Sequence, residues 1–202
     1  MKEKFLNLIR KYSNNENYNL KCWNEIENNY LSKSRYYHNL NHLDNMFSEL
    51  DKVKAQIKDL DTLLFAIYYH DIIYKTNKSD NEHQSALIFE KRISETSFTN
   101  LRKCIIQIEA TKEHKLSNDN DINILLDLDL SILGKSHKEY KKYYEKIRKE
   151  YYIYPDFIYR KGRKKVLKNI LELDSIYKTD FFKQEYENQA RENLRLELEQ
   201  LN

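Results

Sequence analysis

Glycine and proline are scarce in this chain, and that scarcity constrains its fold more than any other feature. Its 202 residues include 2 Gly and 1 Pro, whereas tight hairpin turns depend largely on these two residue types. Lys, Glu, Leu, Asn and Ile dominate the rest, a composition that favours helices. The sequence therefore predicts an all-α protein, a single-domain helical bundle over residues 1–202 that requires no strand.

The bulk properties also limit the setting and the partners. A 40% hydrophobic content over this length is enough for one core. Two cysteines are too few for a disulfide framework, and the first residues carry no signal-peptide pattern, so we expect a cytoplasmic protein. No apolar run approaches the roughly 20 residues that span a bilayer, so no membrane partner is expected. A net charge of +3 does not favour nucleic acid.

An apolar run beginning at Leu63 ends in an adjacent histidine and aspartate, His70 and Asp71. Apolar positions before them follow the i, i+3, i+4, i+7 spacing of a buried helix face. His70 continues that face, so its imidazole is predicted to point into the core. The simpler alternative is a core histidine bonded to a carboxylate. The positions of the face are Leu63, Ala66, Ile67, His70 and Tyr74.

A second helix carries a carboxylate where a leucine is expected. In "DINILLDLDLSILG" the apolar stripe places Asp129 inward, and Asp127 lies about 200° around the helix from it. A lone buried carboxylate is costly, so it is predicted to be protonated, paired or bound to a metal. A buried ion pair remains open for Asp129. The other stripe positions are Ile122, Leu125, Leu126 and Leu133.

An earlier helix adds a histidine to this set. His42 precedes an apolar stripe that begins at Leu43, and His38 lies one turn before it on the same predicted face. Taken alone, each could be a surface histidine. Two imidazoles and two carboxylates suit a divalent cation, Mn, Fe, Co, Ni, Zn or Mg, with coordination positions left for water and substrate. Such a site is equipped for hydrolysis of a phosphate.

The ordered set His42, His70-Asp71 and Asp129 resembles the H…HD…D signature of the HD superfamily of metal-dependent phosphohydrolases. More narrowly, "RYYHNLNHL", "HDIIY", "NEHQSA", "DLDLSILG", "IRKEY", "GRKKVL" and "AREN" resemble a bacterial family of predicted HD-domain phosphohydrolases, over about Arg35 to Leu201. The resemblance implies an all-helical HD-type fold. Its metal-binding core would span about 35–134, with C-terminal helices at 136–201 packing on it.

The resemblance assigns metal ligands residue by residue. His42 matches the first histidine, His70 and Asp71 match the doublet, and Asp129 matches the last aspartate. His38 competes with His42, and Asp127 is the alternative to Asp129. Members with two metals carry further histidines between the doublet and the last aspartate, an interval that here contains His83 and His114. Both could instead lie at solvated helix ends.

For residues outside the ligand set, each functional role has a structural alternative. Glu82 is a candidate general acid or base, although Ser79-x-x-Glu82 also predicts a capping box at a helix start. Arg35 is a candidate for binding a substrate phosphate, the alternative being an exposed charge at a helix start. The basic run at 160–168 could bind a phosphate or RNA, but such runs are usually solvated faces.

Together these features predict a metal-dependent phosphohydrolase that acts on a small phosphorylated molecule such as a nucleotide, using metal-activated water. The first alternative is a non-catalytic domain that binds metal and nucleotide. The second is an RNA-binding helical module that uses the tyrosines and the basic run. The sequence defines neither the substrate, nor the number of metals, nor the oligomeric state.

Overall fold

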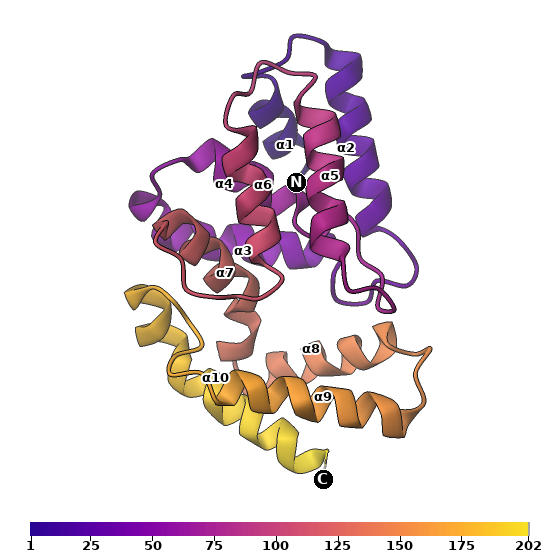
Figure 1. The fold of residues 1–202 in the computed structure, drawn as a ribbon, viewed down its shortest axis with the longest axis vertical. Helices are drawn as coiled ribbons and strands as arrows, with labels where there is room; N and C mark the ends of the chain where they lie inside the picture. Colours follow the sequence, from indigo (N-terminus) through magenta and orange to yellow (C-terminus); the bar gives the residue numbers. More distant parts are fainter. Residues whose placement is uncertain (202) are drawn as a thin grey trace. The chain divides into compact units, whose positions relative to one another are not determined.

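A computed structural model describes residues 1–201 of the chain (Figure 1). These residues form ten α-helices and two short 3-10 helices without a strand, which confirms the predicted all-α class. The chain divides into two compact units, Met1–Leu125 and the part from Leu126 onward, and the boundary lies within α7 (Asn120–Leu130). The HD-type single-domain architecture stays a prediction.

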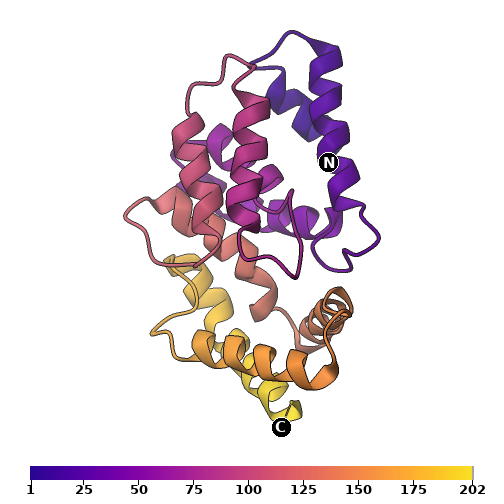
Figure 2. The same cartoon turned by 45° about the vertical axis from the view of Figure 1, so that its right-hand side comes forward.

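The first unit contains the helices that carry the predicted histidines. Helices α5 and α6 lie side by side (Figure 2), and α6 also packs along α4. The elements of this unit that precede α7 are α1 (Lys2–Ile9), α2 (Glu16–Tyr30), α3 (Leu40–Val53), η1 (Lys54–Gln56), α4 (Leu60–Tyr69), α5 (Asn81–Ile93) and α6 (Leu101–Ala110).

Aromatic side chains fill the core of the first unit. The ring of Phe5 from α1 meets Tyr68 of α4 edge to face at 5.0 Å and lies 5.9 Å from Trp23 of α2. All three side chains are at most 1% exposed. Edge-to-face contacts of this kind add to the free energy gained by burial, so α1, α2 and α4 are held by one aromatic cluster.

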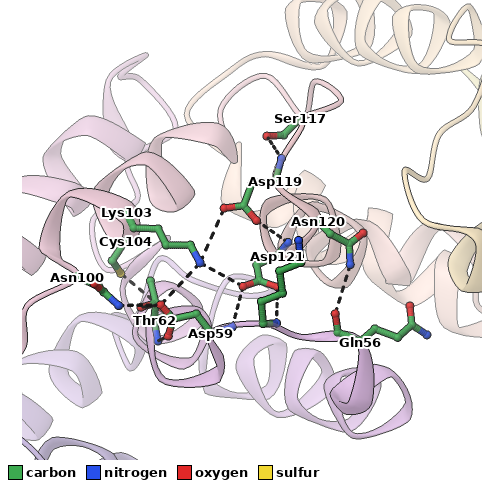
Figure 3. A network of polar contacts seen from close by, with 11 residues as sticks. Gln56, Asp59, Thr62, Asn100, Lys103, Cys104, Ser117, Asp119, Asn120 and Asp121 are labelled. Atoms are coloured by element: carbon green, nitrogen blue, oxygen red, sulfur yellow. Dashed lines mark hydrogen bonds and ion pairs between the residues drawn. The ribbon is translucent and has the colours of Figure 1, made fainter.

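A polar network fixes the start of α7 within this unit (Figure 3). The fully buried carboxylate of Asp121 accepts hydrogen bonds from the backbone N–H groups of Lys58 and Asp59, both at 2.9 Å. The Lys103 ammonium of α6 lies 3.3 Å from Asp121 and 3.7 Å from Asp59, the residue that caps α4. A buried carboxylate is tolerated when it is paired in this way. The network therefore joins α4, α6 and the first turn of α7.

The second unit holds the C-terminal helices. In Figure 1, α8 and α9 form a hairpin and α10 lies beside it. Asn193 of α10 donates hydrogen bonds at 2.8 Å to the carbonyls of Leu133 and Lys135, which ties α10 to the segment before α8. After the end of α7 the elements are η2 (Ser131–Gly134), α8 (His137–Glu150), α9 (Asp156–Leu171) and α10 (Asp180–Gln200).

Two Ser-x-x-Glu patterns, at Ser79 and Ser136, each predict a capping box; the helix boundaries confirm one and correct the other. Ser136 caps α8, because its hydroxyl accepts a hydrogen bond from the Glu139 N–H and donates one to the Glu139 carboxylate at 2.5 Å. The box predicted at Ser79 is wrong. Helix α5 begins one residue later, with Asp80 at the N-cap position and without a side-chain capping bond. Its first residue, Asn81, instead bonds both backbone groups of Lys75.

Every helix of residues 1–201 is too short or too polar to cross a bilayer.

Candidate metal centre

Three of the predicted ligands lie together in the first unit. His42 comes from α3, and His70 and Asp71 follow the end of α4. One donor atom from each lies within 4.8 Å of the donor atoms of the other two. The imidazoles are buried, with His42 2% and His70 1% exposed, whereas the Asp71 side chain is 13% exposed. The two imidazoles are therefore buried, and the Asp71 side chain is the most exposed of the three.

The orientation of the His70 ring is fixed by the backbone. Its Nδ1 lies 2.9 Å from the carbonyl oxygen of Ile67, one turn earlier in α4. A carbonyl can only accept, so Nδ1 carries a proton, and in the neutral imidazole Nε2 then presents a lone pair. Ligating histidines commonly donate their other N–H to such a partner, which orients the ring and raises its basicity. His70 is thus prepared to bind a cation through Nε2.

Two of the three donor–donor distances match those around a single cation, and the third is within 4.8 Å. His42 Nε2 lies 3.3 Å from His70 Nε2, and His70 Nε2 lies 3.3 Å from Asp71 Oδ2. Two donors bound at about 2.1 Å are about 3.0 Å apart at a right angle and about 3.4 Å apart at the tetrahedral angle. Both measured distances fall between these values. Two imidazole nitrogens and a carboxylate oxygen also form a donor set that divalent transition metals accept.

The local backbone explains why the doublet is held at this point. Helix α4 ends at Tyr69, and His70 is its C-cap, donating its N–H to the Ala66 carbonyl at 2.8 Å. The C-terminus of a helix carries partial negative charge and favours a cation nearby. Because α4 ends at Tyr69, the predicted continuation of this helix to Tyr74 is wrong. The predicted burial of Leu63, Ala66, Ile67 and His70 is confirmed.

Arg35 is buried, which contradicts the alternative of an exposed charge at a helix start. It lies outside any helix and is 8% exposed, rather than at the exposed start of a helix. Its Nη1 donates to the Asp71 carbonyl at 2.6 Å and its Nη2 donates to the Ile72 carbonyl at 2.8 Å. The guanidinium also lies 5.0 Å from the ring of Tyr30. Arg35 therefore holds the backbone of the doublet, and its contact with a substrate phosphate stays a prediction.

His38 lies beside the cluster without being a member of it, its ring centroid 5.7 Å from that of His42. Helix α3 begins at Leu40 with Asn39 as its N-cap, so His38 precedes the helix, and the prediction that it shares a helix face with His42 is wrong. Its ring stacks on Tyr74, with centroids 4.0 Å apart. The three-residue cluster contains His42 and not His38. This agrees with the choice of His42 as the first ligand.

The two histidines considered for a second metal lie elsewhere. His83, in the first turn of α5, is paired through Nδ1 with the Glu109 carboxylate at 2.9 Å, and both side chains are exposed. His114 follows the end of α6 and adopts a positive φ of 49°. Neither is a member of the cluster. Both positions match the alternative of helix ends near solvent.

The two aspartates of α7 show the reverse of the predicted burial. Asp127 is fully buried, whereas Asp129 is partly exposed. Asp127 accepts hydrogen bonds from the N–H groups of Lys178 and Thr179 at 2.7 and 2.8 Å. Burial raises the pKa of Asp127 to about 6, against the lowering effect of these bonds. Asp127 thus anchors the segment before α10 within the second unit.

The prediction failed because it assumed one buried stripe. Residues 121–128 are all buried, and a helix buried all round has no polar face to set the register. Asp129 belongs to the second unit, and its place among the metal ligands stays a prediction.

Glu82 lies in the first turn of α5 and is partly exposed. Its role as general acid or base stays a prediction.

The features that sequence reasoning missed are backbone contacts, namely the Ile67 carbonyl behind His70 and the two carbonyls bound by Arg35. A histidine at a helix C-terminus often bonds the last carbonyls, so the first contact had a local signal and the second had none.

Comparison with protein-family models gave no match, and comparisons with curated proteins and with solved structures also gave none.

Proposed function

We propose that this chain is a metal-dependent phosphohydrolase of the HD type that acts on a small phosphorylated substrate. The observation that carries the proposal is the convergence of His42 Nε2, His70 Nε2 and the Asp71 carboxylate within 4.8 Å. The all-helical fold and the order of these residues along the chain are compatible with the resemblance described above. Asp129 is the proposed fourth ligand.

The chain's own residues have distinct parts in this proposal. His42, His70 and Asp71 hold the cation, and Arg35 is a positioning residue that fixes the Asp71 backbone. A divalent cation bound there would polarise a phosphoryl oxygen and lower the pKa of a coordinated water. Glu82 is the proposed group that takes or gives the proton. Because His42 and His70 are buried, the electrostatic interactions between a bound cation and its ligands would be stronger there than in bulk water.

The test is hydrolysis of a panel of phosphomonoesters, nucleotides and phosphodiesters, followed as release of phosphate, pyrophosphate or a phosphomonoester product, with Mn, Fe, Co, Ni, Zn or Mg added in turn. We expect turnover with at least one ion. His70→Ala should lower it by at least about 1,000-fold because a ligand of the activating cation is removed. The matched control is His83→Ala, whose exposed side chain pairs only with Glu109. Equal activity in both variants would overturn the proposal.

The same panel distinguishes hydrolysis from binding alone. Glu82→Gln should retain the metal and lose most turnover, since the amide cannot accept the proton. If the wild-type chain binds metal and nucleotide but hydrolyses no substrate of the panel with any ion, the non-catalytic alternative is correct.

A further inference from the structure

The hairpin of α8 and α9 carries a concentration of positive charge that the proposed hydrolysis does not use. Residues 137–171 include twelve Lys and Arg against four Asp and Glu, a net charge of +8, while the whole chain carries +3. The remaining residues are therefore net negative. A positive charge of this density on one hairpin attracts a polyanionic partner.

The turn of the same hairpin exposes large apolar side chains. Tyr152 is 67% and Phe157 is 74% exposed, and Ile153 and Ile158 are 48% and 45% exposed. These four lie within residues 152–158, and single exposed apolar residues are normal whereas grouped ones indicate a contact surface. We call the four residues the apolar tip.

The turn that carries the apolar tip is held in place by specific side-chain contacts. The Arg148 guanidinium donates to the Asp156 carboxylate at 2.6 and 3.0 Å and to the carbonyls of Tyr151 and Tyr154. It also lies 4.7 Å from the ring of Tyr159. One arginine thus fixes the turn from the inside, so the outward position of the tip belongs to the folded state.

Helix α9 continues this surface with lysines. Leu167 is its one buried residue, although the helix is 16 residues long. Phe157, Lys161 and Lys165 are exposed and spaced four residues apart, so they follow one side of the helix. A groove of about 860 Å³ beside the turn is lined by Phe157, Lys149 and Arg160 among others. The lining also includes Glu145, Asp156 and Glu197, of which Asp156 is paired with Arg148 and Glu197 with Arg163, so apolar, cationic and acidic side chains share this space.

We infer that the apolar tip and the lysines of α9 dock on an anionic lipid surface. Apolar side chains that insert at the headgroup boundary, flanked by lysines that meet anionic lipid, are the combination that holds peripheral proteins on membranes. A second copy fits poorly, because two hairpins of +8 repel each other. Nucleic acid would use the lysines and aromatic rings but not Ile153 and Ile158, which have no flat face for stacking on bases. This inference departs from the expectation of no membrane partner, which rested on the lack of an apolar run long enough to span a bilayer.

The test is sedimentation of the full chain with vesicles of phosphatidylglycerol and phosphatidylcholine in equal parts, beside vesicles of phosphatidylcholine alone. We expect binding to the anionic vesicles that weakens with added NaCl. Phe157→Ser should weaken it by about tenfold, and Lys161→Glu with Lys165→Glu by at least about 30-fold. Because these positions are exposed, the substitutions should leave the melting temperature nearly unchanged.

Matched controls lie in the first unit. Leu116→Ser removes an apolar side chain that is 72% exposed, and Lys2→Glu with Lys21→Glu makes the same change in charge at exposed positions. Both should bind vesicles as the wild type does. The inference is overturned if the wild type ignores anionic vesicles or if tip and control variants bind equally. It is also overturned if the tip variants instead lose binding to poly(U) or lose self-association seen by light scattering.

Discussion

At the scale of single residues, the candidate metal centre depends on contacts with backbone carbonyls, which orient the ring of His70 and fix the backbone of Asp71. His42, His70 and Asp71 were identifiable because an ionisable side chain stood on an apolar stripe or beside one. The ring orientation of His70 depends on the Ile67 carbonyl, and the place of Asp71 depends on Arg35 from a distant segment. Contacts with backbone carbonyls leave no mark in residue periodicity.

His42 and His38 provide a residue-scale prediction. His42→Ala should weaken binding of Zn or Mn by at least about 100-fold, because it removes one of three converging donors, whereas His38→Ala should weaken it by less than about tenfold. Isothermal titration calorimetry of both variants makes the comparison. A larger loss in His38→Ala would mean that the first ligand lies one turn earlier than proposed.

Asp127 and Asp129 provide a second prediction. In Asp127→Asn one carboxylate acceptor becomes a donor facing the N–H of Lys178 or Thr179, so the free energy of unfolding should fall by about 1–3 kcal/mol. Asp129→Asn, at a partly exposed position, should cost less than about 0.5 kcal/mol and should weaken metal binding instead. Denaturant unfolding and metal titration of the two variants separate the roles. Equal loss of stability in both would contradict this assignment.

At the scale of elements, composition and apolar spacing predicted which segments form helices, but they predicted the first and last residues of those helices less accurately. The apolar spacing predicts one buried stripe at Leu43, Met46, Phe47, Leu50, Val53 and Ile57; it is buried as far as Val53, whereas Ile57 lies beyond the end of α3 and is partly exposed. Helix α9 begins at Asp156, whereas the spacing predicted a helix only around Val166 to Leu173. Since α9 buries a single residue, it has almost no apolar stripe from which its start could be read.

The two glycines give an element-scale prediction with opposite signs. A Cβ on Gly134 would lie 2.4 Å from Tyr186 Cβ and 2.8 Å from the Tyr186 carbonyl oxygen, so Gly134→Ala should force η2 away from α10 and cost about 2–4 kcal/mol. A Cβ on Gly162 meets no atom within 4 Å, so Gly162→Ala should stabilise α9 by about 0.5–1 kcal/mol. Thermal unfolding of both variants is the measurement. A stabilised Gly134→Ala would show that η2 is not held against α10.

The loop before α10 gives a prediction about pH. Burial acts to raise the pKa of Glu187, but the N–H groups of Ile176 and Tyr177 and the Arg191 guanidinium outweigh it and hold this pKa below 4.5. A carboxyl whose pKa is lowered by folding stabilises the native state above its unfolded pKa, and this contribution is lost as pH falls through the folded pKa.

Glu187→Gln should therefore flatten the fall in the free energy of unfolding between neutral pH and about pH 3. Glu185→Gln, at an exposed position of the same helix, should keep the wild-type slope. Denaturant unfolding at a series of pH values is the measurement. Identical slopes in the wild type and Glu187→Gln would show that this carboxylate does not stabilise the loop.

At the scale of the whole molecule, the class of fold was predictable and the division into two units was not. Few glycines and prolines led directly to an all-helical chain. The boundary at Leu125 and Leu126 lies inside a continuous helix, where no change in composition and no linker residue marks it. The same helix carries Asp127 and Asp129, and its burial on all sides over residues 121–128 explains why their register was misjudged.

The central claim is that His42, His70 and Asp71 hold a divalent cation. The most direct measurement is the metal content of the chain after loading and desalting, by mass spectrometry, for the wild type, His70→Ala and His83→Ala. The account predicts bound metal in the wild type and in His83→Ala, and loss of it in His70→Ala with the helical circular dichroism retained. Equal metal content in all three, or none in the folded wild type with any divalent ion, would contradict it.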